Sequence, residues 1–284
     1  MNNSFVLGKR FFFSSSNRSG IFRRLNNNII NSAPKDIQIE ELRKPIGLPQ
    51  PPFNTKEYKY GNSFLDLFNS EKTEKRAGEL EVEFRKSGFH DLYVLKKTNG
   101  KIFYSPPSYW KADKSLYFPH LSGQRLADGE ECNIEDSLAG KVSIVRMFTT
   151  DVGKNLIDSY FVDKTHGLDY LKNDLDLLKD VEGAKSAQII EINMAENWLK
   201  MAIVNFAKNK YASIVPEHRH DKTFICNRTQ LPFQIREEIQ INNLYSGYVF
   251  VIDENLKIRW AASGEASQKD FNLLWRCVNA IRKE

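Results

Sequence analysis

The pattern of apolar positions predicts alternating strands and helices in the second half of the chain. VSIVRMF, residues 142–148, is apolar, rich in β-branched residues and too short for a helix, so a buried strand is expected there. AQIIEINM, residues 187–194, has the same character. Between these strands we expect a helix from about Asn155 and then a second helix, whose apolar positions are Leu168, Leu171, Leu175 and Leu178.

Three more elements are predicted towards the C-terminus. Asn193 and Glu196 have the spacing of a capping box, before a helix with the apolar face Trp198, Leu199, Ala202, Ile203 and Phe206. GYVFVIDENLKIRWAAS, residues 247–263, predicts a β-hairpin with Glu254-Asn255 in its turn. Ser267 stands three positions before Asp270 and is expected to cap a last helix, whose buried face is Phe271, Leu274, Trp275, Val278 and Ile281.

The order of these elements predicts the fold class. Strand, helix, strand, helix, hairpin and helix in succession are typical of an α/β, thioredoxin-like (peroxiredoxin-like) mixed sheet flanked by helices. Such a sheet is parallel in its first half and antiparallel in its second. Other α/β layers share part of this order, so the pattern alone leaves the topology open. We assign the thioredoxin-like domain to residues 116–284.

An N-terminal helical and extended extension is predicted before this domain. KPIGLPQPPF, residues 44–53, holds four prolines in ten positions, which favours an extended, Pro-rich arm, assigned to residues 34–60. Residues 61–115 are expected to form a helical and hairpin extension. Its charged first part favours two helical pieces, and LYVLKKTNGKIFYSPPSYW predicts a hairpin that turns at Asn99-Gly100.

Positive charge is concentrated at the N-terminus. Residues 1–33 contain no acidic residue and five basic ones, which equals the whole net charge of +5; they are Lys9, Arg10, Arg18, Arg23 and Arg24. A basic, Ser-rich and amphipathic leader is typical of an organelle transit peptide, with a disordered basic tail as the alternative. The neutral remainder argues against nucleic acid as a partner. No apolar run approaches the roughly 20 residues of a spanning helix, so membrane contact is expected to be peripheral.

Three segments resemble a known family. KPIGLPQPPF, then KADKSLYFPHLSG and finally GYVFVIDENLKIRWAASGEAS are similar, in this order, to the mitochondrial ATP synthase assembly factors of fungi and plants, the "ATPase complex subunit ten" family. The similarity runs from about residue 44 to the end of the chain. It implies that residues 1–33 are a mitochondrial transit peptide. It also implies a peripheral protein on the matrix side of the inner membrane, a chaperone that assists assembly of the Fo sector and contacts its subunit a.

A second similarity lies inside the first. GQRLADGEECNIEDSLAGKVSIVRMFTT, followed later by VFVIDENLKIRW, looks like a peroxiredoxin or thioredoxin framework, which places a nucleophilic cysteine just after its first buried strand. The equivalent loop here, Thr149 to Asn155, contains no cysteine. Ser246-Gly247-Tyr248 stands where a thioredoxin carries the proline opposite its cysteines. The redox activity of that framework is therefore not expected here, and we predict a protein that is not an enzyme.

The candidate chemistry elsewhere is weak. Cys132, Cys226 and Cys277 never form CxxC, so we expect ordinary thiols in a reducing compartment. A thiol-dependent redox enzyme or metallochaperone of thioredoxin-like fold remains the rival interpretation. His218, His220 and Cys226 were weighed as metal ligands, but the cysteine pair that related copper chaperones use is missing, and basic residues flank the histidines. We predict no metal and no cofactor.

The remaining features favour binding to a protein. A Pro-rich arm loses little conformational entropy when it binds, and aromatic residues are favoured at interfaces. The candidate partner-binding residues are Pro49, Pro51, Tyr117, Phe118, Pro119, Thr150 and Asp151. The alternative for the aromatic residues is that they fill the junction between the extension and the α/β body.

Overall fold

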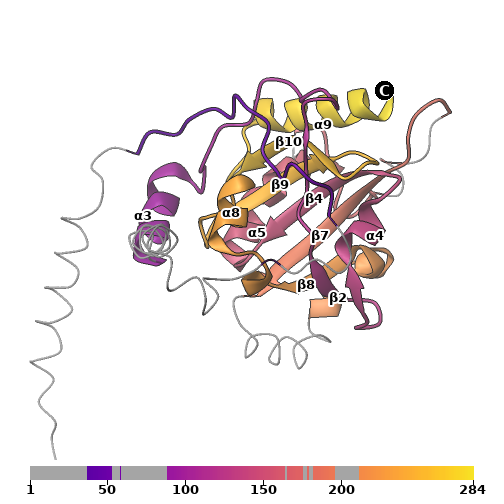
Figure 1. The fold of residues 1–284 in the computed structure, drawn as a ribbon, viewed down its shortest axis with the longest axis horizontal. Coiled ribbons are helices and arrows are strands. Elements are labelled where there is room, and N and C mark those ends of the chain that lie inside the picture. The colour runs from indigo at the N-terminus through magenta and orange to yellow at the C-terminus, as the bar shows by residue number, and fades with distance from the viewer. Residues whose placement is uncertain are drawn as a thin grey trace, which may run out of the picture. The chain divides into compact units, whose positions relative to one another are not determined.

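An eight-stranded sheet with the order β1-β10-β9-β4-β7-β8-β2-β3 organises the structure, a computed structural model (Figure 1). The structure describes residues 37–52, 58, 88–163, 165–174, 178, 182–195 and 211–284, all within a unit that runs from Ile37 to Glu284. The strands of the sheet are β1 (Leu116–Tyr117), β2 (Ser122–Arg125), β3 (Glu131–Asn133), β4 (Val142–Phe148), β7 (Ala187–Ala195), β8 (Thr223–Asn227), β9 (Gly247–Ile252) and β10 (Lys257–Ser263).

The helices connect and cover these strands. The α-helices are α3 (Gly88–Thr98), α4 (Ile134–Leu138), α5 (Asp151–Ile157), α8 (Phe233–Glu238) and α9 (Gln268–Arg282). The 3₁₀ helices are η2 (Asp158–Tyr160), η3 (Glu217–Lys222) and η4 (Arg228–Gln230). A separate two-stranded sheet pairs β5 (Val162–Asp163) with β6 (Leu168–Asp169). Within the described ranges, no helix is both long enough and apolar enough to cross a bilayer.

The four central strands confirm the predicted fold class. β4 and β7 are parallel, with α5 in the connection between them, and β9 pairs antiparallel with β4. β10 then pairs antiparallel with β9, and α9 follows. The resulting order, β7-β4-β9-β10 with these directions, is that of the thioredoxin fold. β8 extends the parallel side next to β7, and β2 and β3 complete that edge.

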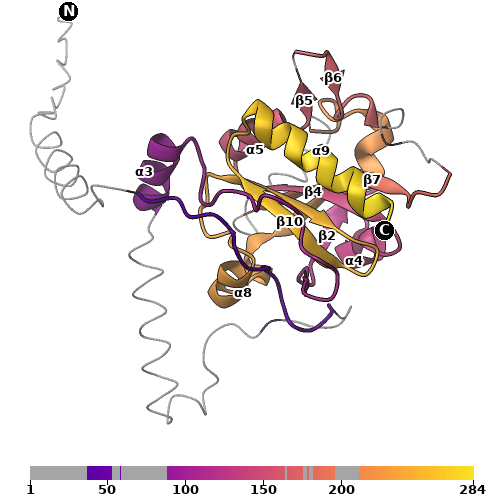
Figure 2. The ribbon, with the colours of Figure 1, turned by 90° about the horizontal axis from the view of Figure 1, so that it is seen from above.

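Both faces of the sheet are covered, which explains why the predicted strands are mostly apolar and do not alternate with polar residues. All seven residues of β4 are buried. Val145 and Met147 face one hydrophobic cluster, with α4 and the segments around α8, while Ile144 and Phe148 face the other, with α9 (Figure 2). Strands buried on both sides are typical of parallel sheets, and this burial is what keeps such runs from alternating with polar residues.

The last helix forms as predicted. The Ser267 hydroxyl accepts a hydrogen bond from the Asp270 amide at 3.3 Å, and the Ser267 amide donates to Asp270 Oδ2 at 3.0 Å. This capping box satisfies donors that the first turn of a helix leaves free. All five positions of the predicted apolar face are buried on the sheet. The hairpin of β9 and β10 is likewise confirmed, with Glu254-Asn255 in its turn.

The N-terminal arm lies along the edge of the sheet. The amides of Leu48 and Tyr117 each donate to the other's carbonyl at 2.8 Å, so the arm pairs with β1 on its outer side. Ile46 is buried in the core, and Gly47 passes so close that a Cβ there would lie 2.7 Å from the Tyr117 carbonyl oxygen. An unpaired strand edge is a template for unwanted association, and the arm covers it here.

The predicted hairpin at Asn99-Gly100 is wrong. LYVLKKT belongs to α3, which ends at Thr98. Asn99 and Gly100 have φ values of 49° and 73°, and the Gly100 amide donates to the Leu95 carbonyl at 3.2 Å, so the pair terminates a helix. Asn-Gly suits both roles because a tight hairpin turn and a helix end require the same left-handed backbone.

The predicted leucine-rich helix is also wrong over its described part. Leu168 lies in β6, which pairs with β5. The Asp163 carboxylate accepts hydrogen bonds from the amides of Thr165 and His166 at 2.8 and 3.3 Å, and Gly167 has a φ of 67°. These local bonds favour a turn over a helix.

Two helix starts are corrected. The helix expected from Asn155 begins at Asp151. Asn193 does not cap a helix, because β7 continues to Ala195. The helical face predicted from Trp198 to Phe206, the transit peptide and most of the two charged helical pieces lie outside the described residues.

Candidate functional site

The segment where a thioredoxin framework keeps its cysteines is the first turn of α5. Thr150 caps this helix, since its hydroxyl accepts a hydrogen bond from the Gly153 amide at 3.2 Å. The segment Thr149 to Asn155 is therefore mostly helical and not the loop that the sequence predicts. Asp151 and Val152 are exposed, and Val152 keeps 46% of its surface in solvent. The turn presents hydroxyl, carboxylate and apolar groups.

The start of β9 lies directly against this turn, as the resemblance to the thioredoxin framework implies. A Cβ on Gly247 would lie 2.2 Å from the Gly153 carbonyl oxygen, and a Cβ on Gly153 would lie 2.7 Å from the Ser246 carbonyl oxygen. Both contacts are between backbone atoms, so a larger residue could enter only if the helix moved away from the strand. The two glycines thus close the space between α5 and β9.

A buried charge pair lies on the α5 side of the sheet, next to this closed space. Arg146 of β4 and Glu191 of β7 are register partners, both 2% exposed, and Arg146 Nη1 donates to Glu191 Oε2 at 2.6 Å. Arg146 Nη2 pairs with Asp158, and the Tyr211 hydroxyl donates to Glu191. Burial opposes ionisation of Glu191, but Arg146 and Tyr211 outweigh it and lower the pKa of this carboxyl. These contacts therefore favour the carboxylate form of Glu191.

Sequence reasoning missed this pair, although a signal was present. VSIVRMF and AQIIEINM each carry one charged residue in a mostly apolar run. Two opposite charges in neighbouring buried strands are expected to meet, because an unpaired buried charge is costly.

The three thiols do not resemble reactive cysteines. Cys226 in β8 is fully buried, and burial raises its pKa far above the usual range. Burial also raises the pKa of Cys132 and brings that of Cys277 to about 11. A reactive cysteine has the opposite property, a lowered pKa at an accessible position. None of the three belongs to α5 or to the start of β9.

The histidines considered as metal ligands bind other groups. His218 Nε2 lies 2.7 Å from Asp174 Oδ1, and His220 Nε2 lies 2.9 Å from the Val215 carbonyl oxygen. Cys226 is buried in the hydrophobic core. Among the described residues no group of three or more His, Cys, Asp or Glu side chains has the arrangement of a metal site.

The candidate partner-binding residues fall into three groups. Pro49 and Pro51 are exposed and Tyr117 is half-buried at the covered edge of the sheet. Thr150 and Asp151 lie at the start of α5. Phe118 and Pro119, in contrast, are buried, and Phe118 packs edge-to-face on Phe250 at 5.8 Å. Both side chains therefore pack inside this chain, as the alternative for the aromatic residues describes for Phe118, and their contact with a partner stays a prediction.

Comparisons with known proteins agree with the resemblance found in the sequence. A family model described as "ATP10 protein" matches residues 27–281. The chain belongs to the ATP10 protein family. The Eremothecium gossypii protein named "Mitochondrial ATPase complex subunit ATP10" is 44% identical over 275 residues, which are 97% of either chain. The Candida glabrata protein of the same name is 46% identical over 273 residues, which are 96% of this chain and 96% of that protein.

Solved structures show weaker similarity. A secreted thiol-disulfide isomerase from Corynebacterium glutamicum aligns with a TM-score of 0.38 and 12% identity, over 63% of this chain and 92% of that one. The assignment of this ATP10 family member to the thioredoxin fold rests on its own strand order and directions.

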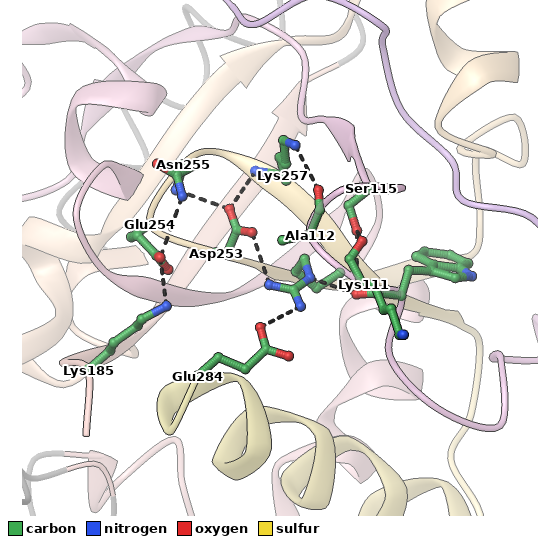
Figure 3. Close-up of polar contacts among 11 residues, drawn as sticks. Lys111, Ala112, Ser115, Lys185, Asp253, Glu254, Asn255, Lys257 and Glu284 are labelled. Carbon is green, nitrogen blue, oxygen red and sulfur yellow. Dashed lines mark hydrogen bonds and ion pairs between the residues drawn. The ribbon is translucent and has the colours of Figure 1, made fainter. Parts of the chain in front are cut away.

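A segment that resembles the ATP10 family, DENLKIRW, forms a buried polar cluster at the β9–β10 turn (Figure 3). Asp253 Oδ1 accepts the amides of Asn255 and Lys257, both at 3.0 Å, and Oδ2 accepts from Arg259 Nη1 at 3.1 Å. Arg259 also donates to Glu284 Oε2 at 2.7 Å and, through Nε, to the Trp110 carbonyl at 2.7 Å. One guanidinium thus joins the turn, the segment before β1 and the C-terminal residue.

Two lysines continue this cluster at the surface. Lys185 pairs with Glu254 at 2.6 Å, and Lys257 Nζ donates to the Ala112 carbonyl at 2.7 Å (Figure 3). Every one of these contacts is internal to the chain. The hydrogen bonds and ion pairs of DENLKIRW therefore hold the β9–β10 turn, the segment before β1 and Glu284 together.

Proposed function

We propose that this ATP10 family protein is an assembly factor for the Fo sector of mitochondrial ATP synthase that works by binding and not by catalysis. The support is membership of a family whose curated relatives carry the name "Mitochondrial ATPase complex subunit ATP10". The basic, acid-free leader supports a mitochondrial location.

The contact between α5 and β9 carries the non-catalytic part of this proposal. A thioredoxin-like enzyme needs a nucleophile at this position and room for a substrate beside it. Here the position is occupied by Thr150, Asp151 and Val152, and Gly153 lies against the backbone of Gly247. The three thiols lie elsewhere and have raised pKa values.

The proposed partner is newly made subunit a, bound on the matrix side of the inner membrane. This partner and this location come from the family resemblance. Binding would cover apolar surface on subunit a until the subunit joins the rest of Fo, which stabilises the intermediate by mass action. The surfaces we propose for contact are the exposed arm at Pro49 and Pro51 with Tyr117, and the α5 start at Thr150 and Asp151.

Crosslinking in isolated mitochondria tests this partner directly. Mitochondrial translation products are labelled in a strain that lacks its own ATP10 family protein and expresses this chain with a photoreactive residue at position 49 or 151. We expect adducts with subunit a, and a probe at exposed Lys141 is the control position. A subunit a band missing from both adducts, while other membrane proteins are crosslinked, would instead indicate a general scaffold.

Removal of the thiols separates binding from redox chemistry. The variant combines Cys132→Ser with Cys226→Ala and Cys277→Ala, because alanine avoids placing a hydroxyl at the two buried positions. We expect it to support ATP synthase assembly as well as the parent chain. Loss of assembly, with the protein folded and present at parental levels, would refute the non-catalytic proposal.

A further inference from the structure

A small cavity of about 260 Å³ opens beside the buried Arg146–Glu191 pair. Its lining combines two kinds of side chain. Val162, Leu171 and Val215 form the apolar part of the wall, and Ile214 lines it as well and keeps 65% of its surface in solvent. The charged members are of both signs, with four cations and three carboxylates: Arg146, Lys154, Lys172 and Arg219, and Asp158, Asp169 and Glu191.

Arg219 is the unusual member of this lining. It is 1% exposed, and its Nη1 donates to the Leu171 carbonyl at 3.4 Å. Its Nη2 is buried and has no hydrogen-bond partner among the described residues. Burial, and next the charge of Arg146, lower the pKa of this guanidinium. A buried donor without a partner costs free energy, and a ligand in the cavity that Arg219 lines would remove this cost once the guanidinium turns towards it.

The neighbouring carboxylates are already paired with other groups. Glu191 and Asp158 bind Arg146, and Asp174 binds His218 and Lys222. Asp169 accepts the amides of Leu171 and Lys172 and pairs with Lys172 at 3.5 Å. In the described parts of the chain, no ion pair is formed by Arg219 or by Lys154.

The ammonium group of Lys154 lies over aromatic rings and does not form an ion pair with a described carboxylate. Its Nζ lies 5.2 Å from the centre of the Tyr211 ring and 6.0 Å from that of Phe148. Such contacts attract a cation without neutralising it. Two cationic side chains therefore line one cavity without a close ion pair of their own among the described residues, and Glu191, which attracts both, is itself held by Arg146.

We propose that this cavity binds a small oxyanion, a carboxylate or a phosphate group, with Arg219 and Lys154 as its donors. A guanidinium donates two parallel hydrogen bonds to such groups, and a lysine adds a mobile positive charge. The apolar wall accommodates a short hydrocarbon body attached to a carboxylate. The volume is below the roughly 300 Å³ at which pockets for drug-sized ligands begin, so the ligand is small. The inference does not depend on the proposed function, because binding is measured on the isolated chain.

Calorimetric titration of the full chain with inorganic phosphate, and separately with isobutyrate, tests the proposal. Sodium chloride keeps the ionic strength constant and serves as the control for screening. We expect saturable binding of at least one of the two anions and a rise of Tm with its concentration. Phosphate alone would identify a phosphate site and isobutyrate alone a carboxylate site. Saturation by neither anion at 50 mM, on the order of a weak metabolite affinity, would overturn the proposal.

Matched substitutions test whether the anion binds at Arg219 and Lys154. Arg219→Met keeps an unbranched apolar side chain, although a shorter one, and removes the guanidinium, so we expect a Kd raised at least tenfold without loss of Tm in the absence of anion. Lys154→Met should raise the Kd severalfold, and exposed Lys141→Met should leave it unchanged. If Arg219→Met does not fold, Lys154→Met decides the outcome. An unchanged Kd in Lys154→Met and in any folded Arg219→Met would place the anion elsewhere and refute the assignment.

Discussion

The buried Asp253–Arg259 pair gives the sharpest stability prediction. In Asp253→Asn the amide oxygen can still accept the amides of Asn255 and Lys257, whereas the charge that faces Arg259 is lost. Removing one partner of a buried ion pair costs about 3–5 kcal/mol when the other charge is left uncompensated. Arg259 keeps Glu284 at 2.7 Å, so compensation is partial. We therefore expect Asp253→Asn to lower the free energy of unfolding by about 2–3 kcal/mol.

Asp253→Ala, compared with Asp253→Asn, separates the contribution of the hydrogen bonds in the turn from that of the charge. It also removes the two hydrogen bonds to Oδ1, each worth about 1 kcal/mol, so we expect a total loss of about 4–5 kcal/mol. Urea unfolding followed by tryptophan fluorescence measures both variants, because Trp260 and Trp275 are buried in the core.

Asp113→Asn is the matched control, since Asp113 is exposed on the segment before β1. It should change stability by less than about 0.5 kcal/mol. Equal urea midpoints for Asp253→Asn and Asp113→Asn would refute the reasoning, because Glu284 alone would then be sufficient to neutralise Arg259.

Three further predictions follow from the described contacts. Gly247→Ala should lower the free energy of unfolding in urea by about 3 kcal/mol, because its Cβ would lie 2.2 Å from the Gly153 carbonyl oxygen. A variant as stable as the parent would show that α5 can move away from β9 without cost. Ser267→Ala removes the cap of α9 and should cost about 1 kcal/mol, whereas Ser267→Asp, which can also cap, should cost less. Hydrogen bonds from His166 lower the pKa of Asp163 to about 2. The stability from this group is complete above the unfolded pKa near 4 and is lost as the pH falls through about 2. In Asp163→Asn the free energy of unfolding, measured in urea at several pH values, should therefore change less with pH between about 4 and 2 than in the parent chain.

The elements that the sequence predicts correctly are those fixed by local pattern and burial together. β4, β7, the β9–β10 hairpin and α9 each have a long apolar run or a strong period, and α9 also has a cap. Errors arose where one local signal has two structural meanings. Asn99-Gly100 can turn a hairpin or end a helix, and the helical residues before it decide in favour of the second. The spacing of Leu168 and Leu171 suggests a helix, but the turn bonds of Asp163 outweigh it.

The candidate site was likewise predicted from the sequence only in part. The meeting of the α5 start with Ser246-Gly247 was expected, because both segments occupy fixed places in a thioredoxin framework. What the sequence could not show is how close they come. A glycine at position 153 is compatible with flexibility, an exposed loop or a tight contact, and only the position of the Ser246 carbonyl distinguishes these. The α5 start therefore lacks a cysteine and also leaves no room beside Gly153 for a larger residue.

The proposed oxyanion cavity could not be predicted from sequence patterns. Arg146, Lys154, Leu171 and Arg219 belong to four separate segments, and none of them forms a motif with its own neighbours. Arg219 is one of the basic residues that flank the histidines in the sequence, where a charged side chain is expected to face solvent, whereas it is 1% exposed. A buried cation beside a cavity is costly in a protein that binds nothing there. Because apolar replacement of such a charge often stabilises a fold, its presence is better explained by a ligand than by stability.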